Sequence, residues 1–164
     1  MKALVIIILI SVTFACENGK DLSNIKSSDL IGVWTLKYSG ESGYPYHFSQ
    51  LAFMDNGDKC ILSYKSNFSG QFNVAYYKST YEVIDGILIS TVSYSSGEFG
   101  LPKGYLIKDK LIHYDESSFN VFMIKPQGDT PENHQKLVGV NPNEICKVVE
   151  RYKEHSEEVV NLST

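Results

Sequence analysis

From residue 31 onward, the sequence is a succession of short runs in which apolar and polar residues alternate. Alternation with a period of two places one face of an extended chain against a core and the other toward solvent. Turn-forming sequences lie between such runs at hairpin spacing: Asp-Asn-Gly at 55–57, Asp-Gly at 85–86 and Lys-Asp at 108–109. The pattern therefore predicts consecutive antiparallel strands. They are expected at residues 31–38, 47–54, 59–65, 71–77, 79–84, 87–94, 104–107, 110–114 and 119–125.

A meander of about eight or nine strands would leave two exposed sheet edges, and closing the sheet on itself removes both. The composition agrees, because 12% aromatic residues, including 11 Tyr, favour strands over helices. We expect an all-β protein: a small antiparallel meander closed as a barrel of about eight strands over residues 29–126, with one C-terminal helix packed on it. A two-sheet sandwich is the alternative architecture.

The C-terminal part of the chain has a different pattern. Residues 127–140 are polar and rich in turn formers, and we expect a connecting loop there. Asn141, Pro142 and Glu144 then provide an N-cap, a first helical residue and a capping-box acid. Apolar residues recur at steps of three and four beyond them, which predicts a helix over 141–160. Its polar face is acidic, so packing on the barrel is expected rather than on a membrane surface.

The N-terminus has the pattern of an export signal. Lys2 precedes an apolar run and small residues, which indicates a signal peptide at 1–15, too short to remain as a membrane span. Cleavage after Ala15 would leave Cys16 first, and residues 13–16 are similar to a bacterial lipobox, which implies lipidation, including palmitate, at Cys16. Residues 16–28 are then expected to be the lipidated Cys and a tether. The expected location is the bacterial cell envelope, lipid-anchored and facing the periplasm or the surface; the alternative is a secreted soluble protein.

Charge argues against nucleic acid as a partner. Loss of Lys2 with the signal peptide would leave 14 basic against 19 acidic residues, a net charge of −5. A surface of this sign attracts no phosphate backbone. The membrane, reached through the lipid, is expected to be a partner.

Catalytic and metal-binding motifs are not found. The His residues show no pair spacing for a metal, and there is no nucleophile elbow or phosphate loop. We therefore expect a non-enzymatic protein without cofactor or metal. The four His residues are His47, His113, His134 and His155.

Cys60 and Cys146 are the remaining cysteines once Cys16 is lipidated. In an oxidising compartment they could form a disulfide, or they could be separate buried thiols. A disulfide would fix the C-terminal helix to the third predicted strand.

Gly32 and Trp34 form a Gly-x-Trp motif at the start of the first predicted strand, and an apolar strand ending in a hairpin follows at 51–58. Together with the aromatic-rich meander, these features resemble the bacterial lipocalin-like lipoproteins over about residues 30–125. The resemblance implies a barrel in which Trp34 plugs the closed end and Gly32 allows close approach of the backbone. The family also places an arginine near this Trp, whereas the only arginine here is Arg151.

Function in such a barrel would lie in its interior, which could hold one small apolar or envelope-derived ligand. The alternative is an envelope protein-binding module with a filled core, such as an inhibitor or a toxin-immunity lipoprotein. Tyrosines on the strands and on the loop expected at 38–46 are candidate contacts with the ligand or partner: Tyr38, Tyr44, Tyr46, Tyr64, Tyr81 and Tyr94.

Overall fold

The structure is a computed structural model that describes residues 21–37, 47–66, 72–97, 99–123 and 132–162. The expected signal peptide and Cys16 lie outside the described residues, as do Tyr38, Tyr44 and Tyr46.

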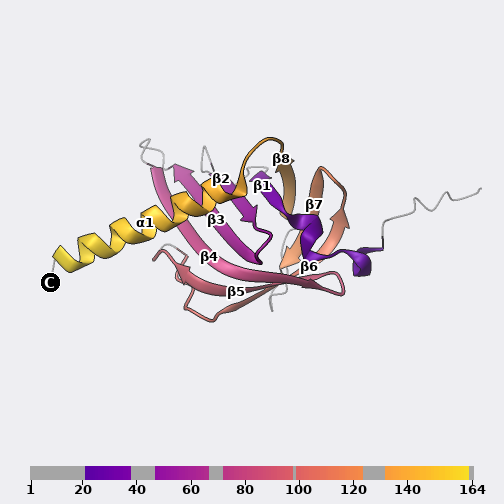
Figure 1. The fold of residues 1–164 in the computed structure, drawn as a ribbon, viewed down its shortest axis with the longest axis horizontal. Helices are drawn as coiled ribbons and strands as arrows, with labels where there is room; N and C mark the ends of the chain where they lie inside the picture. Colours follow the sequence, from indigo (N-terminus) through magenta and orange to yellow (C-terminus); the bar gives the residue numbers. More distant parts are fainter. Residues whose placement is uncertain (1–20, 38–46, 67–71, 98, 124–131, 163–164) are drawn as a thin grey trace, which may run out of the picture.

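A closed antiparallel barrel with one helix packed on it makes up the described chain, which confirms the expected fold class (Figure 1). Each strand pairs with the next, and the last pairs with the first, so the barrel has no free edge. The strands are β1 (Gly32–Lys37), β2 (His47–Phe53), β3 (Asp58–Ser66), β4 (Phe72–Ile84), β5 (Ile87–Ser95), β6 (Leu106–Tyr114), β7 (Ser118–Met123) and β8 (Glu132–Leu137).

Strands β4 and β6 are each continuous where the sequence predicted a break. In β4 the predicted strands are separated at Lys78, but Lys78 continues the strand on its outer face beside the helix, and Ser79 after it is buried. In β6 the predicted turn at 108–109 is wrong. Asp109 is a buried residue of the strand. Its carboxylate lies in the barrel interior, and the charged residue therefore does not mark a turn.

The predicted loop at 127–140 is also wrong in part, because it contains β8. This strand closes the barrel by pairing with both β7 and β1, so the barrel extends beyond residue 126. Glu132 and His134 line the barrel interior. Because polar side chains occupy these inward positions, the apolar alternation that marks a strand is absent from the sequence.

An N-terminal segment packs against one end of the barrel, where the sequence predicted a tether up to residue 28. It comprises the 3₁₀ helices η1 (Leu22–Asn24) and η2 (Ser27–Leu30). Ile25 is 2% exposed in the core, and the Ser27 hydroxyl accepts a hydrogen bond of 2.9 Å from the backbone N–H of Val83. Short 3₁₀ turns bury only isolated apolar residues, so the sequence has no periodic apolar pattern from which they could be predicted.

Trp34 lies in the core next to this segment and is fully buried. Its indole N–H donates to the carbonyl of Leu30 at 2.7 Å, and its ring meets Phe119 edge-on at 4.8 Å. The ammonium of Lys136, on β8, lies 5.2 Å from the Trp34 ring centroid. Gly32 has φ of 136°, and a Cβ there would meet the Lys136 side chain at 3.2 Å, so glycine suits both the backbone and the space.

The helix α1 (Pro142–Leu162) covers the outer face of β2, β3 and β4 (Figure 1). Its start matches the predicted cap, because the Asn141 side-chain oxygen accepts from the backbone N–H of Asn143 at 3.0 Å. Val149 of the helix is fully buried in the cluster beneath it. None of the helices in the described residues is both long and apolar enough to cross a membrane.

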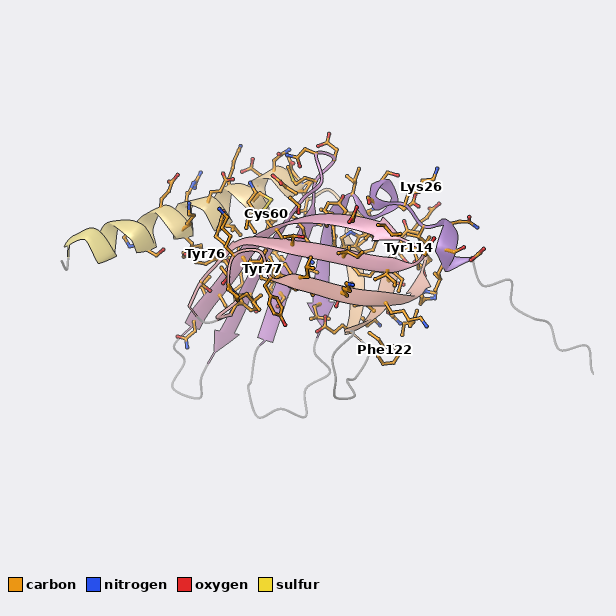
Figure 2. The ribbon with its side chains drawn as sticks, turned by 90° about the horizontal axis from the view of Figure 1, so that it is seen from below. Lys26, Cys60, Tyr76, Tyr77, Tyr114 and Phe122 are labelled. Atoms are coloured by element: carbon orange, nitrogen blue, oxygen red, sulfur yellow. A yellow bond between two sulfur atoms is a disulfide. The ribbon has the colours of Figure 1, made fainter. Side chains whose placement is uncertain are left out.

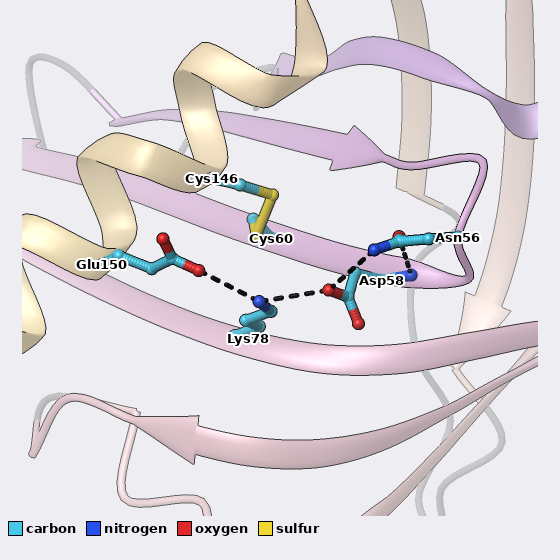
Figure 3. Close-up of polar contacts among 6 residues, drawn as sticks. All are labelled: Asn56, Asp58, Cys60, Lys78, Cys146 and Glu150. Atoms are coloured by element: carbon cyan, nitrogen blue, oxygen red, sulfur yellow. Dashed lines mark hydrogen bonds and ion pairs between the residues drawn. A yellow bond between two sulfur atoms is a disulfide. The ribbon is translucent and has the colours of Figure 1, made fainter.

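A disulfide joins Cys146 in the first turns of α1 to Cys60 on β3, with the two Cα atoms 5.3 Å apart (Figure 3). Of the two alternatives left open by the sequence, the structure therefore contains the bridge. Beside it, the Lys78 ammonium lies between carboxylate oxygens of Asp58 at 3.1 Å and Glu150 at 3.0 Å. The helix is thus attached covalently and by an ion pair.

Candidate functional site

A cavity of about 380 Å³ lies inside the barrel, and neither Trp34 nor the N-terminal segment is among the residues that line it. This volume lies within the range of about 300–1,000 Å³ that is typical of ligand pockets. All eight strands contribute to its wall, together with Phe99 and Leu101 from the connection between β5 and β6. The barrel interior is therefore not filled by the described side chains.

The walls are mainly apolar, as the inward positions of the strands require. Leu36, Leu51, Ile61, Leu88 and Val121 line them.

The connection between β5 and β6 is fixed over the cavity by its own hydrogen bonds. The Ser95 hydroxyl donates to the carbonyl of Leu101 at 2.8 Å and accepts from its N–H at 3.2 Å. The ring of Phe99 meets Tyr77 edge-on at 5.2 Å. Tyr76 and Tyr77, consecutive on β4, lie on opposite faces, with Tyr76 toward α1 and Tyr77 in the barrel (Figure 2).

A buried lysine, Lys59, lines the cavity and is 2% exposed. It lies inside because Cys60, the next residue on β3, faces the helix. The ammonium donates to the Ser90 hydroxyl at 2.7 Å and lies 5.7 Å from the Tyr77 ring centroid. Burial lowers the pKa of Lys59, while the nearby charge of Asp109 opposes that shift.

Two carboxylates share the cavity wall with Lys59. Asp109 is buried on β6, and Glu132 is partly exposed at the start of β8. Both carboxylates favour the charged form of Lys59. Among the described residues, the cavity wall therefore carries two carboxylates, the buried ammonium of Lys59 and the exposed Lys108.

His134 lies on the same wall and is 1% exposed. Its ring stacks flat on Phe119, with centroids 4.4 Å apart, and Nε2 lies 3.7 Å from a carboxylate oxygen of Glu132. Burial, assisted by the charge of Lys59, lowers the pKa of His134 to about 4, against a smaller opposing effect of the carbonyls of Glu132 and Phe119. The imidazole is therefore neutral near neutral pH. Its Nδ1 has no hydrogen-bond partner among the residues that the structure describes.

A pair of serine hydroxyls forms a second polar position. Ser49 on β2 donates to Ser63 on β3 at 2.9 Å, and both side chains are buried at the cavity wall. Small residues at these inward positions leave space that larger side chains would fill.

The tyrosines predicted from the sequence lie elsewhere. Tyr81 is in the barrel core, where its hydroxyl donates to the carbonyl of Met54 at 2.9 Å, and it does not line the cavity. Tyr64 and Tyr94 lie on the outer face beside α1, and the Lys153 ammonium is 5.0 Å from the Tyr94 ring centroid. The three described candidates are therefore not brought together around the cavity.

Sequence reasoning missed the polar residues of the cavity. One sequence feature could have identified them: each charged residue stands two positions before an apolar residue that faces the core, and so shares its face of the strand. Lys59 precedes Ile61 in this way, and Asp109 precedes Leu111. Within the described ranges, no three His, Cys, Asp or Glu side chains are grouped as metal ligands.

Fold and site together define a closed eight-stranded barrel with a mainly apolar cavity and a small polar cluster on one wall. Comparison of the chain with protein-family models and with curated proteins finds no significant match.

Proposed function

We propose that this protein binds one small, mainly apolar ligand in the barrel cavity. The cavity carries the proposal, because its volume and its apolar wall with few polar groups are those of small-molecule sites. Binding is favoured over catalysis because Lys59, the most nucleophilic candidate, already donates to Ser90 and lies among carboxylates. A protein-binding module with a filled core is less well supported, since the interior has space.

Similarity to the lipocalin-like lipoproteins supports the same function. Trp34 lies at the closed end with Gly32 beneath the Lys136 side chain. The family places an arginine near this Trp, and here the ammonium of Lys136 lies over the ring at 5.2 Å. A cation over an indole ring is stabilising whether it belongs to an arginine or to a lysine.

The protein is further proposed to be exported and anchored by a lipid on Cys16 in a bacterial envelope. The lipobox-like sequence at 13–16 supports this. Packing of the chain on the barrel begins near Asp21, and the five residue steps from Cys16 to Asp21 reach at most about 18 Å. The end of the barrel covered by η1 and η2 would therefore face the bilayer.

The test is titration of the folded domain with an apolar fluorescent dye such as N-phenyl-naphthylamine. Ser49 and Gln50 are neighbours on β2, and Ser49 lines the cavity whereas Gln50 does not. Ser49→Trp should weaken dye binding by at least about tenfold, and Gln50→Trp should leave it unchanged. Ser63→Trp provides a second blocking variant.

Circular dichroism would verify that each variant keeps its fold. Equal dye binding by folded Ser49→Trp and wild type, or no saturable site in either, would overturn the proposed function.

A further inference from the structure

We propose that the outer face of β5, β6 and β7 is a contact surface for an anionic lipid bilayer. The barrel then leans on the membrane, with the end that carries η1 and this side of the barrel both near the lipid. The inference goes beyond ligand binding and rests on the proposed lipid anchor at Cys16.

The first step concerns which side chains point outward. Leu88 on β5 and Asp109 on β6 are partners in the sheet, and both are buried. Their neighbours along each strand therefore point away from the barrel. The register aligns outward residues of four strands in one row: Ile84, Ile87, Lys110 and Phe122.

Large apolar side chains are exposed on this face and at its border. Leu106 on β6 is 55% exposed, and Ile84 at the end of β4 is 47% exposed. Phe122 is also exposed, and Figure 2 shows its side chain directed away from the strands. Ile112, at the β-bulge of β6, adds a further exposed apolar side chain. Clustered exposed apolar residues mark contact with a protein or a membrane.

Two lysines lie among these apolar side chains. Lys108 and Lys110 are both exposed, and neither forms an ion pair with another residue that the structure describes. Lysine stems lie along apolar surface while their ammonium groups reach the phosphates of anionic lipids. Glu82 on β4 and Asp85 in the following turn are carboxylates at the border of the face, and they oppose this attraction.

A second copy of the chain fits this face less well than a bilayer. A symmetric dimer places the same surface of both copies together, so the lysines of one copy would meet those of the other. Like charges at an interface oppose association, whereas an anionic bilayer neutralises the lysines.

The position of the N-terminal segment brings the proposed anchor to this face. Leu22 in η1 packs on the turn between β4 and β5, where a Cβ at Gly86 would lie 3.2 Å from the carbonyl oxygen of Leu22. This turn borders the exposed row, and η1 also contacts β6. Cys16 is five residue steps from Asp21, at most about 18 Å. A lipid on Cys16 therefore holds the bilayer within reach of the row.

The helix α1 lies on the other side of the barrel. It covers β2, β3 and β4, and in a closed barrel of eight strands β6 lies opposite β2. Its exposed acidic side chains, such as Glu150 and Glu154, therefore point away from the lipid when the opposite face is in contact. The contact is weak by itself, and the anchor strengthens it by holding the face close to the bilayer.

The experiment uses the chain from residue 16 onward with Cys16→Ser, so that no attached lipid contributes to binding. Co-sedimentation is measured with vesicles of equal parts phosphatidylglycerol and phosphatidylethanolamine, and with vesicles of phosphatidylcholine. The chain should bind the anionic vesicles. Binding should weaken at least about tenfold with phosphatidylcholine, or when NaCl is raised from about 0.05 M to about 0.5 M.

Variants of the face separate the contribution of charge from that of apolar contact. Lys108→Gln combined with Lys110→Gln should weaken binding to the anionic vesicles at least about tenfold, and Phe122→Ser at least about threefold. Lys147→Gln on α1 and Val138→Ser after β8 are the matched controls. Both side chains are exposed away from this face, so neither control should change binding.

The result is independent of the other two proposals. Lys110 and Phe122 do not line the cavity, so Lys110→Gln and Phe122→Ser should bind the apolar dye as the wild-type protein does. Because the chain in this experiment carries no lipid, its binding to vesicles does not depend on whether Cys16 is lipidated in the cell.

No binding to the anionic vesicles, equal binding to both kinds of vesicle, or an unchanged affinity in the folded double lysine variant would overturn the proposal. A dimer in sedimentation velocity that is lost in Phe122→Ser, without vesicle binding by the parent chain, would assign the face to a second copy and overturn it as well. Should the lysine variant fail to fold, as judged by circular dichroism, Glu82→Gln carries the test. It removes a border carboxylate and should strengthen binding to the anionic vesicles, and unchanged or weaker binding would contradict the proposal.

Discussion

Trp34 is fixed from several directions at once, and this determines what its removal would do. Its indole N–H donates a hydrogen bond to the backbone carbonyl of Leu30, Phe119 meets its ring edge-on, and the Lys136 ammonium lies over the ring. The resemblance that Gly32 and Trp34 carry implied a buried Trp at the start of the first strand, and Trp34 is buried there. The resemblance implies an arginine near this Trp. That Lys136 takes this position could not be predicted from the sequence, because the contact depends on β8, which was not predicted as a strand.

Trp34→Ala should lower the free energy of unfolding by about 3–5 kcal/mol, because it removes a fully buried aromatic side chain. Urea unfolding followed by circular dichroism measures this, since the chain has no other Trp for fluorescence. Tyr105→Ala, at a side chain that is 47% exposed, should change stability by less than about 1 kcal/mol. An equally stable Trp34→Ala variant would contradict the assignment of Trp34 as the core of the closed end.

His134 should make stability depend on pH in one direction. Its pKa is about 4 in the folded state against 6.5 for a free side chain, so the unfolded chain binds the proton first as pH falls. The contribution is complete above about pH 6.5 and is lost toward about pH 4, for a total of up to about 3 kcal/mol. Urea unfolding within and above this window should show a smaller pH dependence in His134→Phe than in wild type.

Lys59 and Asp109 show why the polar part of the site was missed. On β3 and β6 their charges occupy positions that alternation assigns to the core, and a charge at such a position is usually read as a break or a turn. The two residues are 50 positions apart, so their proximity depends on the barrel register. Sequence alone offers no reason to pair them.

At the scale of elements, the C-terminal helix lies outside the barrel and packs on the outer face of three strands. It attaches through Cys146, the ion pair of Lys78 with Glu150, and an apolar strip that includes Ile145 and Val149. Figure 3 shows the disulfide and the ion pair side by side on β3 and β4. The ion pair is partly exposed and contributes little on its own.

Replacing Cys60 and Cys146 together by Ala should lower the free energy of unfolding by about 4 kcal/mol, because the bridge closes a long loop in the unfolded chain. Hydrogen exchange should accelerate in α1 more than in the barrel strands. Glu150→Gln is the matched control and should cost less than about 1 kcal/mol. Unchanged stability and unchanged helix exchange in the double variant would contradict this role of the bridge.

Hairpins with strong turn chemistry were predictable, and β8 was not. Asp85 and Gly86 both have positive φ, 50° and 73°, as a two-residue hairpin turn requires. The strand β8 contains Glu, Asn, His, Gln and Lys before its only apolar residue, Leu137, so only its partners on β1 and β7 make it a strand.

At the scale of the whole molecule, the barrel was predictable from edge avoidance, although the details of its strands were not. Two pairs of predicted strands each form one continuous strand, β4 and β6. The strand β8 lies where the sequence predicted a loop. The predicted closure of the barrel and the predicted number of about eight strands are nevertheless confirmed. Both follow from the meander as a whole and do not depend on where each strand begins and ends. The size of the cavity was not predictable, since it depends on small inward residues such as Ser49 and Ser63, which pair on the neighbouring strands β2 and β3.

The proposed anchor gives a prediction for the whole chain. Cys16→Ser should abolish palmitate incorporation and move the protein from the membrane to the soluble fraction of an expressing bacterium. The barrel should keep its stability, because the described fold begins at Asp21. A Cys16→Ser protein that stays in the membrane fraction with the same mass as wild type would contradict lipidation at this residue.

The most direct measurement is native mass spectrometry of the mature chain purified from its own envelope, with the lipid end removed by proteolysis. The account predicts a discrete bound mass of roughly a few hundred daltons, as expected for a pocket of this size. The bound mass should be lost in Ser49→Trp and retained in Gln50→Trp. A clean ligand-free mass in every preparation of the wild-type protein would contradict the claim that the cavity is a binding site.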